Sequence, residues 1–210
     1  MNTSTKLPEY LRRARFMKSV PAISDLPPDT GAEIAVAGRS NVGKSTLLNA
    51  LCDQRGLART SRTPGRTQLI VVFDLGENRR LLDLPGFGYA AVHRELRAQW
   101  EVMISQVLEQ RLALAGLLLV VDARAPLKEE ENRLLQWSEE AKLPVLVALN
   151  KSDKLTRQDS LWATRNMQKS VNALGLQNEV LTVSAAKKLG ISEVAEWLHA
   201  RLEEKLRASL

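Results

Sequence analysis

A glycine-rich stretch has the residue types needed to hold phosphate. Residues 38–45 read GRSNVGKS and match the pattern G-x-x-x-x-G-K-[ST]. The glycines let the backbone wrap tightly, so that successive N–H groups point at an anion beside a helix N-terminus. Lys44 can then reach the β- and γ-phosphates of a nucleotide, and the Ser45 hydroxyl can ligate Mg²⁺. A chance match occurs on the order of 10⁻⁵ per position, so a plain glycine-rich helix cap is the poorer explanation.

A second motif indicates which base is bound. Asn150, Lys151, Ser152 and Asp153 follow an apolar run and fit the N-K-x-D motif of GTPases. The Asp153 carboxylate can accept two hydrogen bonds from the ring and exocyclic nitrogens of guanine, an arrangement that adenine does not offer. Sites built around such bonds discriminate by roughly 10⁴-fold or more. We expect Asn150 to tie this loop to the phosphate-binding loop and the Lys151 stem to cover the base.

Two shorter patterns occur in the order that a GTPase requires. Asp83 and Gly86 fit D-x-x-G, in which the carboxylate holds Mg²⁺, generally through a water, and the glycine amide senses the γ-phosphate. Ser184 opens an S-A-x element whose backbone N–H contacts the guanine oxygen. Each pattern is weak alone, since an ordinary turn explains it equally well. Their order and their places at strand ends give them weight.

The loop of residues 59–67 is the remaining element. A threonine in it should bind Mg²⁺ and the γ-phosphate only in the triphosphate state, which makes the loop a switch. Thr67 is the predicted residue, while Thr60 and Thr63 remain alternatives because composition does not rank three threonines in one loop. An ordinary polar loop is the plain alternative.

The elements around these motifs alternate between short apolar runs and longer amphipathic ones. This alternation is typical of an α/β fold, in which crossover helices join parallel strands. Residues 76–79 leave room only for a hairpin between two of the strands, so one edge strand should be antiparallel. We therefore predict a Ras-like P-loop NTPase fold with helices on both faces of a mixed, mostly parallel six-stranded sheet. The expected strands are 33–37, 68–75, 80–84, 117–122, 145–149 and 180–183.

Helical spacing places Trp100 and Trp197 on core stripes rather than on exposed stacking platforms. Residues 1–30 form a predicted N-terminal extension, and residues 31–210 form the predicted GTP-binding domain. Within the extension, a helix around residues 7–17 and an edge strand at 16–20 fit the pattern equally well.

Composition is that of one folded domain. The chain has 210 residues, 44% hydrophobic and 26% charged. No apolar stretch approaches the roughly 20 residues of a membrane span, and no signal-peptide pattern follows the N-terminal basic residues, so a cytoplasmic location is expected. The lone Cys52 agrees with a reducing compartment and reads as a small buried side chain. A net charge of +6 favours an anionic partner, with RNA ahead of other candidates, although solubility alone also explains it.

The runs GRSNVGKST, SRTPGRTQ, LLDLPGFGYA and LNKSD resemble those of the EngB (YihA/YsxC) family of bacterial GTPases, in the group related to TrmE and Era. The resemblance covers residues 33–206 and implies GTP hydrolysis with Mg²⁺, a role in large ribosomal subunit assembly, and a link to normal cell division and septation. It implies a large-subunit precursor as partner, no membrane, and a monomer. It also implies Mg²⁺ ligation by Ser45 and Thr67 and catalytic roles for Lys44, Thr67 and Gly86.

The nucleotide-contacting residues that the resemblance implies come from five segments. They are Gly38, Arg39, Ser40, Asn41, Val42, Gly43, Lys44, Ser45, Gly65, Arg66, Thr67, Gln68, Leu69, Asp83, Leu84, Pro85, Gly86, Asn150, Lys151, Ser152, Asp153, Ser184, Ala185 and Ala186.

One position departs from the Ras pattern. Phe87 follows D-x-x-G, where Ras places the glutamine that orients the attacking water, and an aromatic ring does not position water by hydrogen bonding. Slow intrinsic hydrolysis that depends on a partner or an ion is therefore expected. Asn41 occupies the position that coordinates K⁺ in some relatives, which suggests potassium stimulation. The alternative function is a nucleotide-controlled interaction module of the division machinery, in which hydrolysis is incidental.

Overall fold

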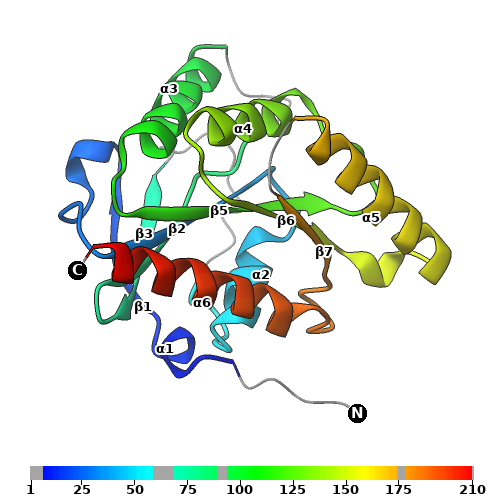
Figure 1. The fold of residues 1–210 in the computed structure, drawn as a ribbon, viewed down its shortest axis with the longest axis horizontal. Helices are drawn as coiled ribbons and strands as arrows, with labels where there is room; N and C mark the ends of the chain where they lie inside the picture. Colours follow the sequence, from blue (N-terminus) through cyan, green and yellow to red (C-terminus); the bar gives the residue numbers. More distant parts are fainter. Residues whose placement is uncertain (1–6, 59–68, 89–93, 175–177, 210) are drawn as a thin grey trace.

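The computed structural model describes residues 7–58, 69–88, 94–174 and 178–209, and within these ranges seven strands form one sheet in the order β1-β3-β4-β2-β5-β6-β7 (Figure 1). The strands are β1 (Arg15–Val20), β2 (Ala32–Gly38), β3 (Ile70–Gly76), β4 (Arg79–Asp83), β5 (Leu114–Asp122), β6 (Val145–Asn150) and β7 (Glu179–Thr182). The neighbours from β4 to β7 pair in parallel, and β3 is antiparallel to both β1 and β4. The predicted α/β P-loop fold class is confirmed.

Two details of the predicted sheet differ. The sheet has seven strands in place of six, because β1 pairs with β3 along its outer side. The antiparallel strand predicted at the edge, β3, consequently lies one position inside it. The predicted hairpin between β3 and β4 is confirmed. Its turn residues Glu77 and Asn78 both have positive φ, 50° and 59°, as a type I′ turn requires.

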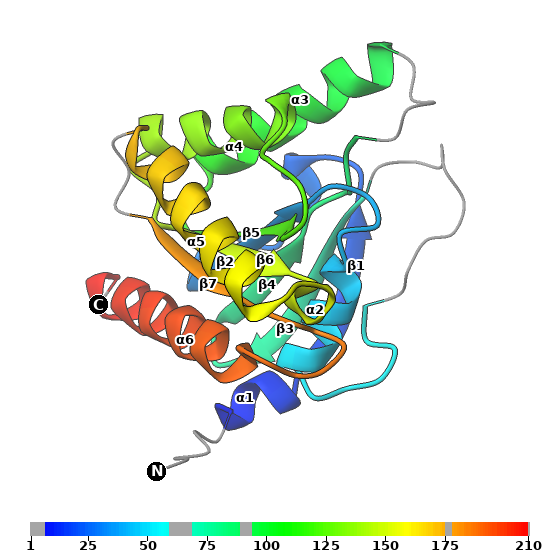
Figure 2. The same cartoon turned by 90° about the vertical axis from the view of Figure 1, so that its right-hand side faces the viewer.

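Helices cover both faces of the sheet (Figure 2). On one face, α2 (Lys44–Leu51) and α6 (Ile191–Ala208) contribute Leu47 and Leu198 to a core that also includes α1 (Glu9–Arg12). On the other face, α3 (Arg94–Gln110), α4 (Glu129–Glu140) and α5 (Arg157–Asn172) pack on a second core. Each helix thus buries one apolar stripe against the sheet. None of the helices in the described ranges is long and apolar enough to cross a membrane.

Several single-residue predictions about the core are confirmed. The side chains of Trp100 and Trp197 are buried, on opposite faces of the sheet. Cys52 is also fully buried, and burial raises the pKa of its thiol to about 12. At neutral pH this thiol is therefore protonated and behaves as a small apolar side chain.

The N-terminal segment joins the same core. Leu11 and Ala14 are buried with the side chains of α2 and α6. The Tyr10 hydroxyl lies 3.2 Å from Nδ1 of His199, and the Arg79 guanidinium lies 5.2 Å from the Tyr10 ring centroid. Residues from α1 and β1 are therefore part of the packed structure, while a domain boundary at residue 30 stays a prediction.

A buried charge cluster closes the end of the sheet opposite Gly38. Glu33, near the start of β2, is fully buried and accepts hydrogen bonds from Arg80 and Arg111 at 2.6 and 2.8 Å. Arg111 also lies 3.4 Å from Asp29. Loss of any one partner should destabilise the fold, because an unpaired charge would remain in a low-dielectric interior.

Replacing Glu33 by Ala should lower the free energy of unfolding by about 3–5 kcal/mol, since two buried guanidinium groups lose their shared carboxylate. Urea denaturation followed by circular dichroism measures the loss. The matched control is Glu77→Ala, which also removes an Arg–Glu pair, but one whose carboxylate side chain is 81% exposed. That control should cost less than about 1 kcal/mol. Equal losses in the two variants would contradict this account of Glu33.

Candidate functional site

The loop between β2 and α2 has the shape of an anion cradle. Positive φ values at Asn41 (67°) and Gly43 (96°) turn the chain into the first turn of α2. A Cβ on Gly43 would collide with the Asn150 amide, and one on Gly38 would lie 2.6 Å from the Val120 carbonyl oxygen. Gly43 also stands at the N-cap of α2 and has no side chain with which to cap it. The first N–H groups of α2 are therefore available to phosphate oxygens.

Lys44 and Asp83 meet at the mouth of this cradle. Lys44 is the first residue of α2, and Asp83 ends β4, the parallel neighbour of β2. Lys44 Nζ pairs directly with Asp83 Oδ1, and both side chains are only 12% exposed. The sheet thus brings together the lysine of the first motif and the carboxylate of D-x-x-G, as parallel neighbours ending at one edge should.

The segment after Asp83 is held against the cradle by its backbone. The Ser40 N–H donates to the Phe87 carbonyl at 2.8 Å. The Phe87 ring is buried and lies 4.7 Å from the Trp100 ring, between centroids. Trp100 Nε1 in turn donates to the Pro85 carbonyl at 3.0 Å. The side chain at the Ras glutamine position therefore points into the core, and α3 fixes the D-x-x-G turn through Trp100.

Asn150 joins the two loops that the sequence motifs define. It ends β6 and is almost fully buried. Its Nδ2 donates to the Val42 carbonyl at 2.9 Å, and its Oδ1 accepts from the Ala185 N–H at 3.0 Å. The predicted link between the base loop and the phosphate-binding loop is confirmed. The same side chain also positions the S-A-x segment, which had not been predicted.

Asp153 is held in an ionised, oriented state. Ser184 Oγ donates to Asp153 Oδ1 at 2.6 Å. This hydrogen bond, aided by the charge of Lys154, keeps the pKa of the Asp153 carboxyl below its usual range. Ser184 is itself fully buried, so its hydroxyl has a fixed direction. A carboxylate fixed in this way is an acceptor for paired N–H donors.

Lys151 contributes a contact that the sequence did not reveal. Its Nζ donates to the Asn41 carbonyl at 2.6 Å and to Asp122 Oδ2 at 3.0 Å. Hydrogen bonds from Arg124 and then Lys151 hold the pKa of Asp122 far below its usual range. The signal that could have found Asp122 was its place at the C-terminal end of a predicted strand, where the ligand edge lies. That the Lys151 stem covers a base stays a prediction.

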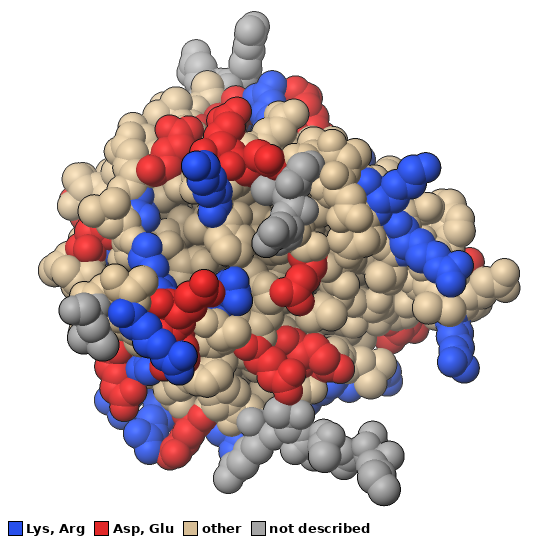
Figure 3. All heavy atoms as spheres, viewed as in Figure 1, with Lys and Arg blue, Asp and Glu red and all other residues tan. Residues whose placement is uncertain are grey.

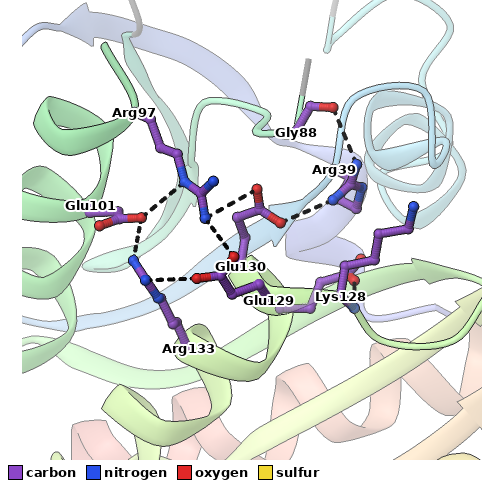
Figure 4. A network of polar contacts seen from close by, with 9 residues as sticks. Arg39, Gly88, Arg97, Glu101, Lys128, Glu129, Glu130 and Arg133 are labelled. Atoms are coloured by element: carbon purple, nitrogen blue, oxygen red, sulfur yellow. Dashed lines mark hydrogen bonds and ion pairs between the residues drawn. The ribbon is translucent and has the colours of Figure 1, made fainter. Parts of the chain in front are cut away.

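Arg39 leads out of the cradle into a network of ion pairs (Figure 4). Its Nη1 lies 3.0 Å from Glu130 Oε2, and its Nη2 donates to the Gly88 carbonyl at 3.2 Å. Glu130 is also 3.6 Å from Arg97 of α3. The cradle, the segment after D-x-x-G, α3 and α4 are thereby connected. The Arg39 side chain is engaged in this network, and a nucleotide contact at this position stays a prediction.

The other predicted residues are distributed as follows. Leu84 is buried and Ala186 is exposed at the end of the S-A-x element. The Ser152 N–H donates to the Val183 carbonyl at 3.1 Å. Leu69 is half-buried just before β3. Gly65, Arg66, Thr67 and Gln68, together with the alternatives Thr60 and Thr63, lie outside the described residues.

The residues present suit magnesium bound through phosphate. No group of three His, Cys, Asp or Glu side chains in the described ranges could hold a metal ion alone. Mg²⁺ typically takes one or two protein oxygens and completes its shell with phosphate oxygens and water. The Ser45 hydroxyl and the Asp83 carboxylate, both next to Lys44 in sequence or in space, fit that donor set.

Comparisons with known proteins agree with this geometry. The family model described as "50S ribosome-binding GTPase" matches residues 33–151, and the one described as "Elongation factor Tu GTP binding domain" matches residues 104–204. A "Probable GTP-binding protein EngB" from Colwellia psychrerythraea is 43% identical over 206 residues, which is 96% of this chain and 91% of the relative. The same-named protein of Haemophilus influenzae is 44% identical over 183 residues, 87% of this chain and 89% of the relative.

Solved structures give the same result. A crystal structure of a probable GTP-binding protein EngB superposes with a TM-score of 0.59 at 25% identity, covering 84% of this chain and 99% of that one. Aquifex aeolicus Era bound to GDP and AlF₄⁻ has a TM-score of 0.60 at 23% identity, covering 81% of this chain and 56% of that one. The second likeness concerns the fold alone.

Proposed function

Because the chain belongs to the EngB family of GTP-binding proteins, we propose that this GTPase acts as a switch in assembly of the large ribosomal subunit. The description of the matching family model, a 50S ribosome-binding GTPase, supports the choice of partner. A net charge of +6 is compatible with a precursor rich in RNA. On this proposal the protein works in the cytoplasm as a monomer, and its loss disturbs division and septation through ribosome supply.

The observation that carries the nucleotide-binding part of this proposal is the double contact of Asn150. One side chain bonds to the phosphate-binding loop at Val42 and to the S-A-x loop at Ala185. The two loops that would hold phosphate and base are therefore fixed relative to each other, which supports recognition of a whole nucleotide. Asp153, oriented by Ser184, would then accept the paired N–H donors of guanine.

Hydrolysis follows from the groups around the cradle. Water attacks the γ-phosphorus as the bond to the β,γ-bridging oxygen breaks, and negative charge grows on that oxygen. The water keeps one proton as a hydroxyl of the released phosphate, and its other proton passes to a phosphate oxygen or to solvent. Lys44 and the N–H groups at the start of α2 stabilise this charge. Ser45 and Thr67 would help to hold magnesium, which would supply further neutralisation of charge. Thr67 and the Gly86 amide would sense the γ-phosphate, so their contacts are lost when it leaves.

The purified protein should hydrolyse GTP slowly, because the Phe87 ring is buried against Trp100 and offers no hydrogen bond to a water. Phosphate release under single-turnover conditions measures this rate. Adding purified large subunits should raise it, since a partner would supply the missing orientation. Rapid turnover by the protein alone would refute the proposal that hydrolysis depends on a partner.

The same assay tests the proposed role of Asn41. Its backbone has a positive φ of 67° and its carbonyl accepts from Lys151, so its side chain is displayed from a fixed turn of the cradle. Faster phosphate release in potassium than in sodium buffer would support ion binding there. Equal rates of phosphate release in the two buffers would contradict potassium binding at Asn41.

A further inference from the structure

The outward face of α5 carries an aromatic side chain where solvent-facing helices usually carry none. Trp162 is 69% exposed and Leu161 is 55% exposed. Trp100 and Trp197, by contrast, are buried in the two cores. Arg165 and Lys169, on the same helix, are also exposed. Figure 3 shows basic side chains gathered at the right of the molecule, where α5 lies in Figure 1.

Helical geometry places these groups side by side. Trp162, Arg165 and Lys169 stand at positions i, i+3 and i+7, so their side chains leave one face of the helix. Three exposed or partly exposed amide side chains flank them, and together the six residues are named here the α5 face: Gln158, Trp162, Arg165, Asn166, Lys169 and Asn172.

The α5 face carries positive charge without a compensating carboxylate. None of its six residues is acidic, and no ion pair joins Arg165 or Lys169 to a carboxylate in the described ranges. Asp159 lies at the N-terminal margin of this face. Its carboxylate accepts a hydrogen bond from the hydroxyl of Thr156, the N-cap residue, and its N–H donates to the same hydroxyl. By contrast, Arg97 on α3 and Arg133 on α4 are each paired with glutamates. Two cations without acidic neighbours suit phosphate groups.

The opposite side of α5 anchors the helix. Met167 and Val171 are buried in the core, and Thr164 Oγ1 lies 2.7 Å from Thr182 Oγ1 of β7. Gln168 also donates to the Asn178 carbonyl at 3.1 Å. Packing of the helix therefore does not need Trp162, which is free to serve a ligand. The helix begins four residues after Asp153, so such a ligand would lie close to the base loop.

We propose that the α5 face binds a single-stranded or looped segment of RNA, with an unpaired base stacked on Trp162 and backbone phosphates bound by Arg165 and Lys169. Aromatic platforms beside cations and amides are the usual means of holding unpaired RNA. The inference rests on the proposed function only in taking that RNA to be ribosomal.

The test is fluorescence anisotropy with a labelled 12-nucleotide single-stranded oligouridylate, with an RNA duplex of equal length for comparison. Trp162→Ala should weaken single-strand binding between about 5- and 150-fold, the range expected for loss of one stacked base. Trp162→Phe should retain most of the affinity. Arg165→Ala with Lys169→Ala should reduce the slope of log affinity against log salt by about 1.4, at about 0.7 per phosphate contact.

The matched control is Lys205→Ala with Arg207→Ala on α6, which removes the same charge from another helix. It should leave the affinity and the salt slope nearly unchanged. If the control pair reduced RNA affinity as much as the α5 pair, net charge alone would account for binding, and the proposal would be overturned. Unchanged RNA affinity in Trp162→Ala would also overturn the proposal. The same holds if Trp162→Ala changes only the self-association of the protein, measured by sedimentation.

Two further readouts separate this inference from the proposed function. Affinity for a fluorescent GDP analogue should be the same in Trp162→Ala as in the parent, because Trp162 belongs to none of the predicted nucleotide-binding segments. Loss of oligouridylate binding in that variant supports the α5 face whether or not the protein binds large subunits. Oligouridylate affinity that is unchanged in Trp162→Ala, while the parent protein binds large subunits, would overturn the inference and leave the switch proposal standing.

Discussion

Replacing Asp153 by Asn should change the base preference of the site from guanine to xanthine. On the proposed assignment the Asp153 carboxylate would accept from two N–H groups of guanine, whereas an amide would present its own NH₂ to the exocyclic amine and leave donors facing each other. Affinity for GTP should fall by roughly 10⁴-fold. Xanthine has a carbonyl in place of that amine, so xanthosine triphosphate should bind the variant better than GTP. Titration with fluorescent forms of both nucleotides measures the change.

The control is the same Asp-to-Asn substitution at a position outside the base loop. Asp159→Asn, beside the N-cap of α5, removes one carboxylate without touching the base loop. It should leave both affinities within about twofold. Ser184 still has an Oδ1 acceptor in Asp153→Asn, so the loop should keep its position. A variant that retained GTP affinity, or failed to gain xanthosine triphosphate, would contradict the assignment of Asp153.

Replacing Lys44 by Ala should lower the single-turnover rate of GTP hydrolysis by about 10²- to 10³-fold, the usual cost of removing one donor aimed at developing charge. The substitution also leaves Asp83 without its partner at the mouth of the cradle. Radiolabelled GTP with excess protein, followed over hours, resolves the slow rates.

The control for Lys44 is Lys188→Ala, which breaks a lysine–aspartate pair on the surface at 2.7 Å. Because that pair with Asp53 lies away from the cradle, the hydrolysis rate should not change. If the two variants hydrolysed GTP equally fast, Lys44 would have no part in stabilising the transition state.

Local patterns in the sequence predicted the central strands and the main motifs. β2, β5 and β6 are apolar runs buried on both faces, and such runs are recognisable without knowledge of their partners. The motifs at Gly38, Asp83 and Asn150 each follow one of these strands or β4, so topology alone brings them to one edge.

The sequence of β1 did not distinguish a strand from a helix, because the strand is stabilised by pairing with a distant part of the chain. Of its residues only Val20 is buried, so no alternating pattern distinguishes a strand from a helix. Its pairing partners lie in β3, at least fifty residues further along the chain. The strand forms because an edge of the sheet is available, and pattern-based reasoning about a short segment contains no such information.

Long-range polar contacts were the other unpredictable part of the site. Arg39 pairs with Glu130, which is 91 positions away, and Lys151 pairs with Asp122 at a separation of 29. Neither partner belongs to a recognised motif, and each is charged like much of the ordinary surface. Only the folded chain brings Glu130, in the first turn of α4, next to Arg39 (Figure 4).

The most direct test of the central claim is sedimentation of cell lysate on a sucrose gradient, with probing for this protein. The lysate is prepared with GDP or with a non-hydrolysable GTP analogue, each at low and high salt. A GTP-controlled switch in subunit assembly predicts co-migration with large-subunit particles that needs the analogue and weakens with salt. Absence from every ribosomal fraction with both nucleotides would contradict it.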